Sequence, residues 1–203
     1  GDYGAGDEAE AIATIERAIA LGVNFFDTAD AYGRGRNEAL LGRALKGRRD
    51  GVVLATKFGP VRDADGRSAI NGRPEYVVQA CDASPERLGT DVIDLYYLHR
   101  PDPTVPLVDT VSAMAELIEA GKVRHWGLSN YDAAGTQQVL SACDAATLPR
   151  PVVQQPAFSL LNRGIEADLL PLCRRESIAV VPYRTLEGGL LSGKYGPHAA
   201  PPG

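Results

Sequence analysis

The feature that most constrains the fold is a regular alternation of short apolar runs with helix-like segments. Six runs rich in Val, Ile, Phe and Tyr begin at Val23, Val52, Val92, Val123, Val152 and Ala179. Each run is almost continuously apolar, which is typical of parallel strands buried on both faces. The segments between them carry apolar residues at helical spacing. The alternation therefore predicts right-handed βαβ units and a parallel sheet.

Two architectures contain such units, an open doubly wound sheet and a (β/α)8 barrel. An open sheet that binds a dinucleotide usually carries G-x-G-x-x-G after its first strand. Here Gly33 and Gly35 supply two of the glycines, but Glu38 occupies the third position, and there is no G-x-x-x-x-G-K-[ST] motif. The sequence therefore favours the (β/α)8 barrel (TIM barrel).

The spacing of the runs bears on how much of a barrel is present. The run starts lie 27 to 40 residues apart, so eight units would need about 250 residues, the usual size of such a barrel. The chain has 203 residues and six runs. A helix-like segment precedes the first run, and no helix-like segment follows the sixth. We therefore expect residues 1–203 to form one partial barrel domain that lacks the first and eighth strands, which are neighbours in a closed barrel.

Composition excludes several classes of protein. The net charge of −5 gives no reason to expect nucleic acid as a partner, and no apolar run is long enough to span a membrane. There is no basic-then-apolar start of the kind that signal peptides have. The three cysteines, Cys81, Cys143 and Cys173, are widely spaced and suit a reducing cytoplasm rather than disulfides or a metal site. We expect no metal ion.

Four polar residues stand at or just after the ends of the first three runs, namely Asp27, Tyr32, Lys57 and His99. In barrel enzymes the reacting groups lie at the carboxyl ends of the strands, so the four could share one pocket. Each also has a structural interpretation: a turn carboxylate, a core aromatic, a solvated lysine or a packing histidine. Spacing alone leaves both interpretations open.

The chemistry that these four residues offer is proton transfer by a phenol. A free tyrosine has a pKa near 10, and a lysine ammonium close by favours the phenolate. Asp27 would hold the lysine, and His99 would donate to a substrate oxygen. Because no strong nucleophile accompanies them, the set suits protonation of a carbonyl oxygen while a hydride arrives from elsewhere.

Several strings resemble the aldo-keto reductase family, in order and at the right spacing over roughly residues 4 to 196. They are GVNFFDTADAYGRGRNEALLGRALK, VVLATKFG, RLGTDVIDLYYLHRPDP, AGKVRHWGLSN and GLLSGKY. The resemblance implies a (β/α)8 barrel and an oxidoreductase that reduces aldehydes or ketones to alcohols with NADPH. It places Asp27, Tyr32, Lys57 and His99 on the catalytic tetrad of that family, with the tyrosine as general acid.

The resemblance also implies cofactor-binding residues, at Ser129, Asn130, Gln155, Tyr183 and Leu186. The first three fall where the family binds the nicotinamide carboxamide, and Tyr183 matches the aromatic residue that stacks on the nicotinamide ring. NADPH rather than NADH follows from the family alone, because the segment that would bind the 2′-phosphate is absent. The alternatives are a non-catalytic nucleotide-binding sensor subunit of the same fold and an inactive fragment. The carbonyl substrate and the oligomeric state are not specified.

Three local features carry further expectations. The 15 residues from Gly59 to Arg73 are interpreted as a loop on the substrate side of the barrel. The segment from Arg184 onward is interpreted as loop-like. Pro85 lies within a helix-like stretch and is expected to kink it, because proline lacks the backbone N–H.

Overall fold

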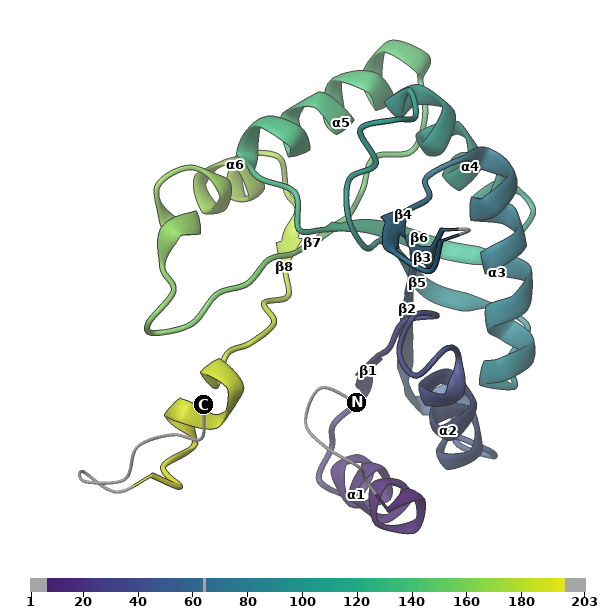
Figure 1. Ribbon diagram of the computed structural model, residues 1–203, viewed down its shortest axis with the longest axis vertical. Helices are drawn as coiled ribbons and strands as arrows, with labels where there is room; N and C mark the ends of the chain where they lie inside the picture. The colour runs from purple at the N-terminus through teal and green to yellow at the C-terminus, as the bar shows by residue number, and fades with distance from the viewer. Residues whose placement is uncertain (1–6, 64, 196–203) are drawn as a thin grey trace.

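Six parallel strands form one curved sheet with helices along its outer side (Figure 1). The computed structural model describes residues 7–63 and 65–195 of the chain. The sheet has the order β1-β2-β5-β6-β7-β8. Its strands are β1 Phe25–Asp27, β2 Val53–Phe58, β5 Ile93–Leu98, β6 Val123–Ser129, β7 Val153–Gln155 and β8 Ala179–Val180. Every pairing within the sheet is parallel, so all six strands end at the same edge, as the alternation predicts.

The helices occupy the segments between the strands. They are α1 Glu8–Ala20, α2 Arg36–Ala44, α3 Pro74–Leu88, α4 Leu107–Glu119, α5 Ala133–Ala146 and α6 Leu169–Arg175. Three of them begin at aspartates that accept from backbone N–H groups: Asp7 accepts from Ala9 at 2.8 Å, Asp132 from Gly135 at 2.7 Å and Asp168 from Leu169 at 2.6 Å. The helix assignment of α3 continues across Pro85 to Leu88.

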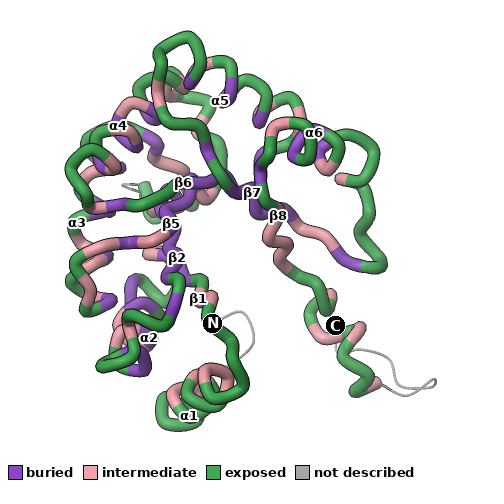
Figure 2. The backbone as a smooth tube through the Cα atoms, turned by 180° about the vertical axis from the view of Figure 1, so that it is seen from behind, coloured by how far each residue is buried: buried purple, intermediate pink, exposed green. Residues whose placement is uncertain are grey.

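The main core lies between the sheet and the helices, and Figure 2 shows burial concentrated along β2, β5, β6 and β7. Phe58 and Tyr96 stack at a ring-centroid distance of 4.8 Å, and Trp126 is 1% exposed beside them. Met114 on α4 and Val139 on α5 belong to the same buried cluster. The outward-facing residues of the strands are therefore packed under α3, α4 and α5.

The inner side of the sheet carries a smaller cluster. Ala55, Leu95, Tyr97 and Val153 are buried there, and they come from three strands of the sheet. Lys57 of β2 is in register with Tyr97 of β5, and its ammonium lies 5.8 Å from the centre of that ring. The carboxyl ends of β2 and β5 therefore bring a charged group onto the inner side.

Two segments differ from the loops that the sequence predicts. The segment from Gly59 to Arg73 contains an antiparallel hairpin of β3 Pro60–Arg62 and β4 Ser68–Ile70. The segment after β8 contains the short 3-10 turn η3 Glu187–Ser192, and two further 3-10 turns, η1 Arg49–Gly51 and η2 Gly164–Glu166, lie in connections. Among the described residues, no helix is long and apolar enough to cross a membrane.

Candidate active site

Lys57 is the most buried charged side chain of the candidate site. It stands next to the end of β2 with no exposed surface, pairs with Asp27 at the end of β1, and donates to the carbonyl oxygen of Thr28 at 2.7 Å. Burial lowers the pKa of Lys57, while the charge of Asp27 opposes that shift. The fold therefore holds a buried ammonium in a fixed position between two neighbouring strands.

Tyr32 lies over this ammonium. The Lys57 Nζ atom is 5.1 Å from the centre of the Tyr32 ring, and Tyr32 as a residue is 41% exposed. A tight turn places the tyrosine there, because its backbone N–H donates to Ala29 at 3.1 Å. Tyr32 thus lies between a buried positive charge and the surface.

His99 forms the other side of Tyr32. The two ring centroids are 5.7 Å apart, with an interplanar angle of 83°. Burial, together with the nearby charges of Lys57 and Arg100, lowers the pKa of His99 to about 4. The imidazole is therefore neutral at pH 7 and carries one N–H. Its Nδ1 atom is buried and makes no hydrogen bond to any described residue.

A second group of predicted residues follows the neighbouring strands. Asn130 donates to the carbonyl oxygen of His99 at 2.9 Å and accepts from the Tyr183 hydroxyl at 2.7 Å. The Ser129 hydroxyl donates to the Gln155 carbonyl oxygen at 3.0 Å. The Gln155 side chain donates to Asp27 at 3.1 Å, which links this group to the tetrad positions.

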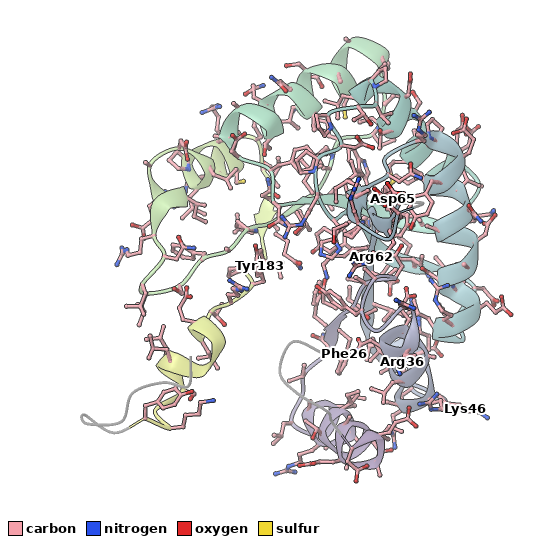
Figure 3. The ribbon with its side chains drawn as sticks, in the orientation of Figure 1. Phe26, Arg36, Lys46, Arg62, Asp65 and Tyr183 are labelled. Carbon is pink, nitrogen blue, oxygen red and sulfur yellow. The ribbon has the colours of Figure 1, made fainter. Side chains whose placement is uncertain are left out.

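Tyr183 belongs to the segment after β8, where Figure 3 labels it. Its backbone N–H donates to the Pro156 carbonyl at 2.9 Å, which ties it to the end of β7. Leu186 is 55% exposed, and its carbonyl accepts from Gly189 and Leu191 within its own turn. The structure therefore brings Ser129, Asn130, Gln155 and Tyr183 together, whereas no hydrogen bond joins Leu186 to them among the described residues.

The donor set at these strand ends fits a nicotinamide. Hydroxyl and amide groups of Ser129, Asn130 and Gln155 can exchange hydrogen bonds with a carboxamide, and the Tyr183 ring offers an aromatic face. The hydrogen bond from Gln155 to Asp27 connects these residues to the tetrad positions at the ends of the first three strands of the sheet. A phenol beside a buried ammonium can exchange a proton next to such a ring.

Two acidic residues next to the tetrad positions, Asp30 and Glu38, were not predicted to belong to the site. Asp30 accepts from the Tyr76 hydroxyl at 3.2 Å, and burial raises the pKa of Asp30 to about 6. Glu38, fully buried, accepts from Thr56 at 2.7 Å and pairs with Arg87 at 2.6 Å. In the sequence, Glu38 could be noticed as a carboxylate beside the apolar residues of a predicted helix. Its partners, Thr56 on β2 and Arg87 on α3, could not be predicted, because they approach Glu38 only when the chain folds.

Comparison with known proteins identifies the relatives of this chain. A sequence model of the aldo/keto reductase family matches residues 1–202. "Probable aldo-keto reductase 1" of Glycine max is 42% identical over 188 residues, which are 92% of this chain and 53% of that protein. The chain thus spans about half the length of this curated relative.

Solved structures of the same family superpose closely. Aldo-keto reductase AKR11C1 from Bacillus halodurans, in its holo form, gives a TM-score of 0.85 at 33% identity, over 96% of this chain and 63% of that one. An aldo/keto reductase from Klebsiella pneumoniae, in complex with NADP and acetate, gives 0.80 at 34% identity, over 95% and 64%. These likenesses confirm the (β/α)8-barrel fold class, of which the described residues supply six strands. The chain belongs to the aldo/keto reductase family.

Proposed function

We propose that this protein reduces an aldehyde or a ketone to an alcohol, with NADPH as the hydride source. The observation that carries the proposal is the position of Tyr32 between the buried ammonium of Lys57 and the neutral imidazole of His99. Such a phenol can protonate a carbonyl oxygen because a fixed positive charge stabilises the phenolate that remains.

Each residue has a defined role in this step. Tyr32 donates its phenolic proton to the carbonyl oxygen. Lys57, with its ammonium 5.1 Å from the Tyr32 ring centre, stabilises the phenolate by charge attraction. Asp27 holds Lys57 in place and offsets part of that stabilisation. His99 donates one N–H to the carbonyl oxygen and orients it.

The strand ends that follow supply the cofactor site. Ser129, Asn130 and Gln155 would bind the carboxamide of the nicotinamide, and the ring of Tyr183 would stack on it. When bound there, NADPH supplies the hydride. The Klebsiella pneumoniae relative was solved with NADP, which supports this choice of cofactor. Leu186 remains a proposed contact in the loop next to the cofactor.

Replacement of Tyr32 by phenylalanine tests the proposal in the full-length protein. Tyr32→Phe removes the proton donor while keeping the ring, so we expect reduction of a small aldehyde to fall roughly 10²-fold or more. NADPH binding, followed by nucleotide fluorescence, is expected to stay within about twofold, since the hydroxyl of Tyr32 belongs to the proton-transfer step rather than to the predicted nucleotide contacts.

Tyr195→Phe is the matched control, because it removes a phenolic hydroxyl from the segment after η3. Equal turnover by Tyr32→Phe and the unmodified protein would contradict the proposal. Tight NADPH binding without turnover of any small aldehyde would favour a nucleotide-binding sensor instead.

A further inference from the structure

A cavity of about 970 Å³ lies between the β3–β4 hairpin, α3 and the loop before α2. It adjoins the candidate active site at two points. Arg100, which lines the cavity, directly follows His99 in the chain, and the backbone N–H of Asp30, another lining residue, donates to the Lys57 carbonyl at 3.0 Å. Nothing in the proposed proton transfer uses this space.

The cavity is lined by more positive than negative charge. Among the described residues, four arginines, Arg34, Arg62, Arg87 and Arg100, line it, and Asp30 is the one acidic residue. Arg87 is already paired with the buried Glu38. The other three come from separate segments: Arg34 from the loop before α2, Arg62 from the hairpin (Figure 3), and Arg100 from the end of β5. Within residues 7–63 and 65–195, none of these three has a carboxylate partner.

Asp30 compensates this charge only in part. Its Oδ2 atom accepts from Tyr76, whereas its Oδ1 atom is buried and has no hydrogen-bond partner among the described residues. The pKa of Asp30 is raised to about 6, mainly by burial and in smaller part by Glu38 on α2, while the hydrogen bond from Tyr76 and the charge of Arg87 on α3 oppose the shift. Three exposed arginines that line the same cavity repel one another, and a single carboxyl group among the described lining residues opposes them. An anion between them would relieve the repulsion, because arginine binds carboxylate and phosphate oxygens in paired hydrogen bonds.

Much of the remaining lining is apolar, although Ser68, Tyr76 and Gln79 also line the cavity. Val61, Ala69, Ile70, Ala80 and Ala83 contribute to the walls, from the hairpin on one side and α3 on the other. A bare inorganic ion would leave these walls in contact with water, whereas an organic molecule would cover them.

We propose that this cavity binds a small organic anion, whose carboxylate or phosphate group lies among Arg34, Arg62 and Arg100 and whose carbon chain lies against the hairpin and α3. The anion is either the acidic end of the carbonyl substrate or a separate molecule. Only the first case rests on the proposed reductase function, and the experiment below separates the two.

Binding of succinate to the full-length protein, followed by titration calorimetry, is the primary measurement. Arg34→Gln combined with Arg62→Gln removes two charge-assisted contacts, and we expect succinate to bind at least about tenfold more weakly. Arg17→Gln is the matched control, because Arg17 is an exposed arginine of α1 outside the cavity. It should leave the dissociation constant unchanged.

Asp30→Asn provides a test of opposite sign that does not depend on the stability of the double variant. It removes the one negative charge of the cavity and keeps the shape of the side chain, so succinate should bind several-fold more tightly at pH 7. The titratable and charged groups near Asp30 are Tyr76, Tyr96, Glu38, Arg87 and Lys57. The gain in affinity from Asp30→Asn should therefore be larger at pH 8 than at pH 5, because Asp30 is ionised only above about pH 6, and the comparison between the two proteins cancels the titration of succinate itself.

Two aldehydes of equal length, 4-oxobutanoate and butanal, decide the source of the anion. If the anion is the substrate's own acidic end, the ratio of kcat/KM for 4-oxobutanoate to that for butanal exceeds one and falls about tenfold in Arg34→Gln/Arg62→Gln. If the anion is a separate molecule, the ratio stays near one while succinate binding still requires the arginines. Failure to reduce either aldehyde, with arginine-dependent succinate binding intact, would sink the reductase proposal and leave the anion site standing. Absence of succinate binding, or equal affinity in the double variant and the unmodified protein, would overturn the anion site.

Discussion

The two sides of the sheet use neighbouring residues of the same strands for different tasks. On β2, Phe58 points outward and stacks on Tyr96 beneath the helices, whereas Lys57, the residue before it, points inward to Asp27. The outer side buries large apolar side chains from three helices and three strands, while the inner side buries a smaller cluster of residues and holds charge at the strand ends. Successive residues of a strand point to opposite sides of the sheet, so residues that stabilise the fold and residues of the candidate site can be direct neighbours in the chain.

The largest expected effect on stability comes from the outer side. Trp126→Ala removes a side chain that is 1% exposed and whose indole N–H donates to the Pro149 carbonyl at 3.0 Å. We expect the free energy of unfolding to fall by about 3–5 kcal/mol, measured by urea denaturation. Leu160→Ala, at a residue that is 75% exposed, should change it by less than about 0.5 kcal/mol. Similar urea midpoints for Trp126→Ala and Leu160→Ala would contradict the inference that the outer side of the sheet supplies most of the stability.

On the inner side the largest effect is expected on activity. Lys57→Met keeps most of the volume and removes the charge beside Tyr32, so the proposed aldehyde reduction should fall roughly 10²-fold. Stability should fall as well, because loss of one partner of a buried ion pair leaves the other charge uncompensated, although Asp27 is partly exposed and keeps its bond from Gln155. The control is Lys46→Met, at an exposed lysine beyond α2. Retention of activity by Lys57→Met would show that the inner charge has no catalytic role.

A smaller effect on the free energy of unfolding is expected from Asp30 and His99, whose contributions depend on pH in opposite directions. Burial raises the pKa of Asp30 to about 6, so ionisation of Asp30 destabilises the fold as the pH rises from about 4 to 6. Burial lowers the pKa of His99 to about 4, so its protonation destabilises the fold as the pH falls from about 6.5 to 4. The two contributions, each on the order of 2 kcal/mol, offset one another in the unmodified protein.

Asp30→Asn should expose the contribution of His99. We expect the free energy of unfolding of this variant to fall, between pH 6.5 and 4, by on the order of 2 kcal/mol more than that of the unmodified protein. Urea denaturation at a series of pH values measures the difference. Asp109→Asn, an exposed carboxylate of α4, is the control. If the free energy of unfolding depends on pH in the same way for Asp30→Asn and the unmodified protein, Asp30 and His99 do not make opposite contributions.

The strands of the sheet could be predicted because buried parallel strands are continuous apolar runs. The run starting at Val23 begins two residues before β1, and the other five agree with the observed strands at their starts to within one residue. The β3–β4 hairpin could not be predicted in the same way. Its strands have three residues each, too few to show a period, and their pairing depends on the turn that includes Asp63 and Gly66.

The tetrad positions could be placed because each lies at or just after a strand end, where a parallel sheet collects its side chains. The contacts of Asp30 with Tyr76 and of Glu38 with Arg87 could not, since they depend on how α3 packs against the loops and strands before it. The bond from Gln155 to Asp27 is likewise a property of the curved sheet. The resemblance predicts a carboxamide contact for Gln155, and the structure adds this second partner.

That bond joins residues 128 positions apart in the chain, whereas Lys57 and Asp27 are only 30 apart. Closing so long a loop costs conformational entropy that must be offset by the strands between them. As the chain leaves the ribosome, Asp27, Lys57 and His99 emerge first, and Gln155 can reach Asp27 only after β5, β6 and β7 have taken their places. The order of synthesis therefore delays completion of the site until most of the sheet exists.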